Sequence, residues 1–378
     1  MAINLRSPYF IGTTQPNASY TILELKIWDG NLQSVPLNSQ YTLKKSVAGT
    51  SQKIFFDLSE LIRDYIDITF NGNYNGQAVW FQVEQKVYNA SNVVINTFNL
   101  GSQLALDGYW YFEESQLATP SILISNRELF VLEDNVFRVP IYVDNTPTVV
   151  FYKDGEIVAS ETFTTSVESS QQIKYVSIYG DNINWDTFQE RVLNENGSYE
   201  DSSCLQSFFN SYSISAVDKI TVSDSNGIET IKVNVIEECK YEPKKVTFVN
   251  KFGALQDMYF FKKAVEQMTI EKESYKSNII SSTGTYNSYS HVNRDFNMVG
   301  KESITLSSGF LSEEYNEVFK QLMLSEKVWI TNMLESGEQV LPINVKTSDI
   351  TYKTSLNDKL VEYTIEFDKS FDTINNIR

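Results

Sequence analysis

Two-residue turn signals set between short alternating segments are the feature that most constrains the fold of this chain. Asp154-Gly155 and Asn226-Gly227 each divide a stretch in which apolar and polar residues alternate. Such pairs supply the positive φ angles that a tight β-hairpin turn requires. Short strands punctuated in this way are typical of β-sandwiches. We therefore expect a mainly β chain.

The first hundred residues follow this pattern with one interruption. Residues 19–30 and 76–88 alternate as strands do. Between them, apolar residues recur at helical spacing from Leu58 to Ile66, and Asp57 with Glu60 resembles a capping box. A short helix is therefore expected between two strands.

The C-terminal part predicts a small sheet with one helix. Residues 246–250 and 257–261 read as strands joined by a turn at Gly253, where a positive φ angle is expected. Residues 281–295 are polar and predict a long loop. Residues 312–325 predict the best helix of the chain, with Ser312 as its N-cap.

Charge changes near residue 243, which suggests a domain boundary there. The chain of 378 residues carries a net charge of −17, of which residues 1–243 hold −15 and the remainder −2. Chain length favours two or three domains. We predict an N-terminal β-sandwich with a short helix over 1–108, a second β-sandwich over 109–242, and a C-terminal β-domain with a helix over 243–378.

Catalytic motifs are absent from the sequence, so we do not expect an enzyme. A single histidine, His291, would have to serve every histidine-dependent mechanism, and it lies in a polar segment. No nucleotide-binding glycine motif occurs. Cys204 and Cys239 lack metal-binding spacing and read as two reduced thiols, with a disulfide as the alternative. We predict no catalytic residue, cofactor or metal site.

The acidic charge argues against two classes of partner. Binding to phosphate groups of nucleic acid or of an anionic membrane requires clustered Lys and Arg. The N-terminal residues also lack the apolar core of a signal peptide, and no apolar run is long enough to span a membrane. Synthesis and residence in a cytoplasm are therefore expected, without membrane binding.

Aromatic clusters offer the main candidate for an interaction surface. Four bulky residues follow one another at Met258, Tyr259, Phe260 and Phe261. Successive side chains of a strand point to opposite faces, so a small sheet cannot bury all four by itself. We expect a neighbouring subunit or domain to cover the rest. The predicted subunit interface comprises these four residues with Tyr315 and Phe319 of the adjacent helix.

Several segments together resemble structural proteins of tailed bacteriophages that infect Bacteroidota. They are INLRSPYFI, FFDLSELIRDYIDITFNGNY, YWYFEES, ECKYEPKKVTFVNKFGALQDMYFF and SGFLSEEYNEVFKQLMLSEKVWI. The resemblance covers most of the chain and is similar to tail or baseplate components of the distal-tail type. These motifs are architectural rather than catalytic.

The resemblance implies a virion protein that forms a ring between tail tube and tail tip or baseplate. Proteins of this kind combine a tube-like β-sandwich bearing one helix with immunoglobulin-like modules. A homo-oligomer is implied, with a hexameric ring favoured over a trimer, together with other tail proteins as partners. Here the ring-forming domain would come last, whereas in distal tail proteins it usually comes first.

Two points stay open at the level of sequence. An acidic lumen would keep DNA from adhering to a channel wall, but acidity equally serves solubility. The alternative function is a carbohydrate-binding, host-recognition protein built from β-sandwiches. Its candidate stacking platforms are Trp80, Trp110, Trp185 and Trp329.

Overall fold

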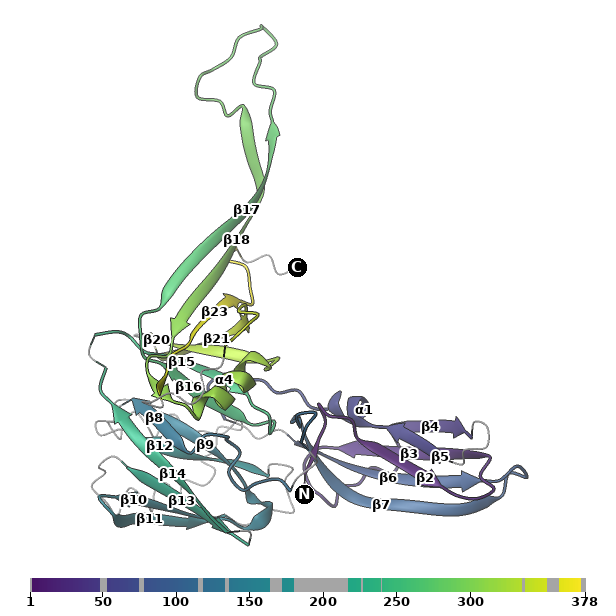
Figure 1. Ribbon diagram of the computed structural model, residues 1–378. Coiled ribbons are helices and arrows are strands. Elements are labelled where there is room, and N and C mark those ends of the chain that lie inside the picture. Colours follow the sequence, from purple (N-terminus) through teal and green to yellow (C-terminus); the bar gives the residue numbers. More distant parts are fainter. Residues whose placement is uncertain are drawn as a thin grey trace. The chain divides into compact units, whose positions relative to one another are not determined.

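The described part of the chain is mainly β, as the sequence predicts, and contains several sheets and few helices (Figure 1). The computed structural model describes residues 2–47, 53–74, 78–114, 118–132, 136–163, 172–179, 217–225, 227–238, 240–334, 337–351 and 360–374. Two compact units are present. Unit 1 comprises Met1–Glu237, Thr247–Met258 and Glu314–Ser325, and unit 2 comprises Glu238–Val246, Tyr259–Glu313 and Glu326–Arg378. The predicted boundaries at 108/109 and 242/243 stay predictions.

Unit 1 begins with two sheets that enclose an apolar core. The larger has the order β1 (Ile3–Asn4), β7 (Val94–Leu106), β6 (Ala78–Tyr88), β3 (Tyr20–Trp28), β4 (Tyr41–Ser46), and the smaller pairs β2 (Phe10–Thr14) with β5 (Lys53–Asp57). Strand β3 buries Leu23, Leu25 and Ile27, because residues two apart share a face. The core cluster that contains these three residues also includes Ile54 and Phe56 of β5.

The predicted short helix is present and is shorter than its apolar pattern. It is α1 (Ser59–Arg63), and Ile62 is buried. Asp57 lies near its start, where its carboxylate accepts hydrogen bonds from the backbone N–H and the hydroxyl of Ser59. Tyr65 and Ile66 lie beyond the helix end, so the helical face stops one turn early.

The second sheet group of unit 1 confirms the predicted Asp154-Gly155 hairpin. Its five-stranded sheet has the order β11 (Glu156–Thr162), β10 (Thr148–Lys153), β13 (Lys219–Asp224), β14 (Gly227–Ile236), β8 (Glu128–Leu132). A two-stranded sheet pairs β12 (Ile173–Tyr179) with β9 (Val136–Tyr142), and the 3-10 helix η1 (Val143–Asn145) follows β9. Lys153 pairs with Glu156, and both loop residues between them have positive φ angles.

Two later segments of the chain complete unit 1. The first contains the turn between β15 (Lys244–Val249) and β16 (Leu255–Phe260), where Gly253 has φ +76°, as the sequence predicts. The second contains α4 (Tyr315–Met323). A core cluster contains Phe252 and Ala254 of this turn together with Leu106 and Leu123, which belong to Met1–Glu237.

The helix α4 begins later than predicted and without the predicted cap. Its N-cap residue is Glu314, which makes no side-chain capping bond, whereas Ser312 belongs to the short strand β19 (Leu311–Ser312). The carboxylate of Glu314 instead accepts the backbone N–H of Arg127. The apolar stripe is confirmed at Tyr315 and Phe319, which are buried together with Val318 and Leu322.

Unit 2 is built on an antiparallel sheet. Its strands follow the order β20 (Val328–Leu334), β21 (Gly337–Val345), β23 (Thr364–Lys369), β18 (Asn293–Ser307), β17 (Val265–Lys276), and the sheet continues from β20 through β15 to β16. Strand β19 pairs with β22 (Leu360–Val361). The segment from residue 360 to residue 369 therefore contains two strands, β22 and β23.

A long hairpin is the most unusual element of unit 2. Strands β17 and β18 pair along their length and run on together past β23, ending in the loop 277–292 (Figure 1). Of β18, only Ser303–Ser307 at its base pairs with β23. The predicted loop over 281–295 is confirmed except at its end, which already belongs to β18. We call residues 265–307 the arm.

Candidate functional site

The residues predicted as a subunit interface are all buried within the single chain. They are Met258, Tyr259, Phe260, Phe261, Tyr315 and Phe319. Phe260 packs edge-on against Phe367 of β23, with ring centroids 6.1 Å apart, and Tyr315 packs against Phe130 of β8 at 5.6 Å. Of the six, Met258, Tyr315 and Phe319 belong to unit 1, and Tyr259, Phe260 and Phe261 belong to unit 2.

The side chains of Met258–Phe261 that we expected a neighbouring subunit or domain to cover are therefore covered within this chain, without a second subunit. Every residue of β16 is buried, so the strand is covered on both of its faces by other parts of this chain. A covered side chain offers no surface to a second subunit. The reason for placing an interface at these six residues is removed.

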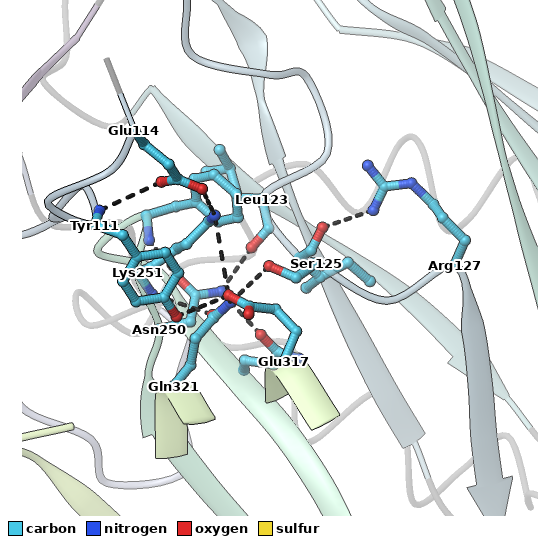
Figure 2. A network of polar contacts seen from close by, with 12 residues as sticks. Tyr111, Glu114, Leu123, Ser125, Arg127, Asn250, Lys251, Glu317 and Gln321 are labelled. Carbon is cyan, nitrogen blue, oxygen red and sulfur yellow. Dashed lines mark hydrogen bonds and ion pairs between the residues drawn. The ribbon is translucent and has the colours of Figure 1, made fainter. Parts of the chain in front are cut away.

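A network of polar contacts holds together three segments of unit 1 that lie far apart in the sequence (Figure 2). They are the segment after β7, the turn before β16 and the helix α4. Lys251 of the turn is at the centre, with its ammonium 3.4 Å from Glu114 and 4.0 Å from Glu317. Its side chain is only 13% exposed, so these ion pairs are shielded from water more than surface pairs are.

Tyr111 and Gln321 extend this network along α4. The Tyr111 hydroxyl donates a hydrogen bond of 2.8 Å to Glu317, and the Gln321 amide donates to Glu317 at 2.9 Å and to Ser125 at 2.6 Å. The ammonium of Lys320 lies 3.3 Å from the centre of the Tyr111 ring, a cation–π contact. Glu317 is thus held by two donors while it neutralises Lys251.

Asn250 fixes the turn that carries Lys251. Its side-chain oxygen accepts the backbone N–H groups of Phe252 and Ala254, and its amide donates to the Leu123 carbonyl at 2.6 Å and to Gln256 at 3.0 Å. The side chain is fully buried. Because a buried amide without partners is costly, these bonds specify one conformation of the turn.

The backbone of the turn also approaches the segment after β7 closely. The Gly253 position leaves no room for a side chain, since a Cβ atom there would lie 2.9 Å from the backbone C and N atoms of Asp107. Gly108 is similarly confined by Asn4 and the Lys251 carbonyl. The Lys251 carbonyl accepts the backbone N–H of Tyr109 at 2.7 Å. Only glycine permits this contact at both positions.

Burial shifts the tyrosines of this network away from ionisation. Desolvation raises the pKa of Tyr109 to about 12, and it raises the pKa of Tyr111 further with help from the hydrogen bond to Glu317. Both phenols therefore stay protonated at neutral pH. A general acid or base would need a pKa near the working pH, so neither phenol is suited to proton transfer. Tyr111 donates its hydrogen bond to Glu317, and Tyr109 packs edge-on against the Tyr111 ring.

The described residues contain no arrangement that suggests catalysis. No cluster of three metal-ligating side chains occurs among them. His291 is exposed in the loop of the arm. Cys204, Cys239 and Trp185 lie outside the described residues. The network around Lys251 is internally paired, and its chemistry is that of a structural clamp.

The predicted tryptophan platforms are mostly covered. Trp329 is buried, and the half-buried Trp80 donates its indole N–H to the Gly30 carbonyl. Trp110 is half-buried as well, while the neighbouring Phe112 is fully exposed. The YWYF run forms no strand, so its members do not alternate between two faces.

Exposed apolar side chains gather instead on the arm. Among the described residues, ten of the 26 large apolar side chains that are exposed lie between residues 265 and 298. They are Val265, Met268, Ile270, Tyr275, Ile280, Tyr286, Tyr289, Val292, Phe296 and Met298. This concentration makes the arm the element to consider as an interaction surface.

The network around Lys251 and the exposed apolar side chains of the arm were not predicted from the sequence, for physical reasons. Lys251 and Glu114 are 137 residues apart, and nothing in the local sequence pairs them. In β17 the apolar residues Val265, Met268 and Ile270 do not keep a period of two, so the strand escapes pattern recognition. A loop as long as 277–292 also exceeds the usual hairpin connection.

Comparison with known proteins adds no family to these observations. No protein-family model matches the sequence, and no curated protein matches it either.

No helix in the described part of the chain has the length and apolar character needed to cross a bilayer.

Proposed function

We propose that this protein is a structural subunit of a phage tail that assembles into a ring between tail tube and tail tip. The assignment to a tail derives from the sequence resemblance described above. The observation that supports assembly into a ring is the large share of the exposed apolar side chains that lies on the arm. A two-stranded ribbon is marginally stable alone in water, and burial in an assembly would stabilise it.

The internally paired network of unit 1 supports a structural role. The single ammonium of Lys251 forms ion pairs with both Glu114 and Glu317, and all the hydrogen-bonding groups of the Asn250 side chain find partners within the chain. Such a clamp resists deformation, which a load-bearing part of a tail requires. The proposed partners are further copies of the chain and other tail proteins, and a hexameric ring is favoured over a trimer.

Electron microscopy of the purified protein tests this proposal. The expected result is closed rings of uniform diameter at micromolar concentration, with mass photometry giving one discrete multiple of the chain mass. A heterologous contact that closes produces such rings. A protein that remains monomeric at every concentration, and is monomeric within virions, would refute the proposal.

A carbohydrate-binding role has one observation in its favour. Tyr286 and Tyr289 are 70% and 80% exposed in the loop of the arm, where aromatic rings could stack on sugars. A glycan array tests this alternative. Binding that is lost in the variant Tyr286→Ser/Tyr289→Ser would support it, and an array without a binder would exclude it.

A further inference from the structure

Within the described residues no strand covers the outer backbone edge of β17, and β23 leaves the distal part of β18 uncovered as well. Strand β17 stands at the end of its sheet and, within the described residues, pairs with β18 alone. Its burial pattern is exposed at all twelve positions from Val265 to Lys276. A long exposed edge strand presents unpaired N–H and C=O groups, which are a template for pairing with another chain.

Both faces of the arm carry apolar side chains. Met268 and Ile270 share one face, because residues two apart point the same way along a strand. Val265 and Tyr275 lie on the other, where the Tyr275 ring packs edge-on against Phe296 at 5.6 Å. A single flat surface would cover only one of these faces. The arm is therefore shaped to lie between two surfaces.

The charges of the arm are nearly balanced, like those of the rest of the chain after residue 243 and in contrast to residues 1–243, which hold a net charge of −15. Residues 265–307 contain four Lys or Arg and five Asp or Glu, which leaves 27 and 43 for all other residues. Two ion pairs lie within the arm, Lys272–Asp295 at 2.7 Å and Lys301–Glu271 at 2.9 Å. The loop 277–292 contains no Lys, Arg, Asp or Glu.

This charge distribution points to a second copy as the partner. Two copies of a strongly acidic chain repel each other over most of their surfaces. The nearly neutral arm can approach an acidic neighbour without this electrostatic repulsion. For a strongly cationic or anionic partner, we would expect an arm that carries the opposite net charge.

The arm also carries features that limit indiscriminate pairing. Its two strands shift register between Glu271 and Glu273, and Asn297 adopts a positive φ angle opposite this shift. Bulges and charged residues at an edge are devices that prevent open-ended aggregation. An edge protected in this way, yet left exposed and apolar, is suited to one defined partner.

We infer that the arm docks onto a second copy of this chain, with the edge of β17 and both ribbon faces buried in the contact. The inference rests on the proposed function, because it specifies how copies of a ring subunit hold one another.

A pair of matched double variants of the full chain tests the contact. Met268→Ser/Ile270→Ser removes two arm side chains that are 50% and 59% exposed. The control, Ile157→Ser/Ile228→Ser, removes side chains that are 60% and 74% exposed on β11 and β14. Exposed substitutions leave folding nearly unchanged, so all three proteins should melt within about 2 °C of one another. Burial of either arm side chain in a contact is worth about tenfold in affinity or more.

Mass photometry and sedimentation velocity then give the concentration at half assembly. We expect an increase of at least about tenfold for the arm variant and less than about twofold for the control. If the unsubstituted chain forms rings and the arm variant forms them equally well, the inference is refuted and the proposed function stands. If the unsubstituted chain never assembles, both are refuted.

Cross-linking identifies the partner directly. A mixture of unlabelled and ¹⁵N-labelled chains, treated with an amine-reactive reagent, yields mixed-isotope links only between copies. We expect such links from Lys272 and Lys276 of the arm. Links from these two lysines that are exclusively within one copy, in assembled material, would overturn the inference.

Discussion

Replacing Gly253 by alanine tests the closest backbone contact of unit 1. Gly253 has φ +76°, a conformation that costs an L-residue about 1–2 kcal/mol. The added methyl group would also lie 2.9 Å from the Asp107 backbone, and overpacking of this kind costs about 1–3 kcal/mol. Backbone atoms cannot rotate away as a flexible side chain can. We therefore expect Gly253→Ala to reduce the free energy of unfolding by about 2–5 kcal/mol.

The matched control is Gly155→Ala in the hairpin between β10 and β11. Gly155 has a similar φ of +84°, but no atom lies within 4 Å of its would-be Cβ. This variant should lose only the conformational part, about 1–2 kcal/mol. The difference between the two variants isolates the contact between the turn and Asp107.

Equilibrium urea unfolding, followed by tryptophan fluorescence and circular dichroism, measures both changes. Hydrogen exchange would locate the effect at residues 107–111 and 250–254. Equal losses for Gly253→Ala and Gly155→Ala would refute the reasoning, because the close approach would then contribute nothing.

The remaining predictions concern charge, pH and the core. Lys251→Met should cost about 1–2 kcal/mol and keep most of this effect in high salt, because its side chain is only 13% exposed. Lys232→Met, which removes a largely exposed partner of Glu128, should cost below about 0.5 kcal/mol and lose that effect in high salt; urea unfolding at two ionic strengths compares them. Because the raised pKa of Tyr109 favours the protonated phenol in the folded state, stability should be complete below pH 10 and fall as pH rises towards 12; Tyr109→Phe should flatten this loss in alkaline unfolding curves. Phe260→Ser should lower the free energy of unfolding of unit 2 by about 3–5 kcal/mol, measured by thermal or urea unfolding, because the ring is buried in the core. A monomer as stable as the unsubstituted chain would contradict this core position.

Local sequence signals predicted the elements whose stability is local. The Asp154-Gly155 hairpin and the Gly253 turn follow from φ angles that few residues tolerate, and both are present. The helix near the C-terminus follows from its apolar stripe, which is buried as expected. Its first residue was misplaced because Glu314 binds the Arg127 backbone, a contact 187 residues away that no local pattern reveals.

Predictions that required knowledge of tertiary packing failed. The alternation rule assumes that one face of a strand meets water, whereas β16 is covered on both faces. The aromatic run at Met258–Phe261 therefore belongs to the core. Conversely, β17 is exposed on both faces and lacks a clear period, so its apolar residues were not recognised as a surface. Whether neither, one or both faces of a strand are buried depends on segments that lie far away in the sequence.

The discontinuity of unit 1 has a consequence for its synthesis. Glu317 and Gln321 of α4 complete the network around Lys251, yet Ser325, the last residue of unit 1, comes 88 positions after Glu237. At translation rates of about 5–20 residues per second, the nascent chain waits roughly 4–18 s for this helix. During that interval the nascent chain exposes the polar groups that later contact α4, and we expect chaperones to bind this intermediate. For the same reason, no single cut in the gene yields unit 1 intact.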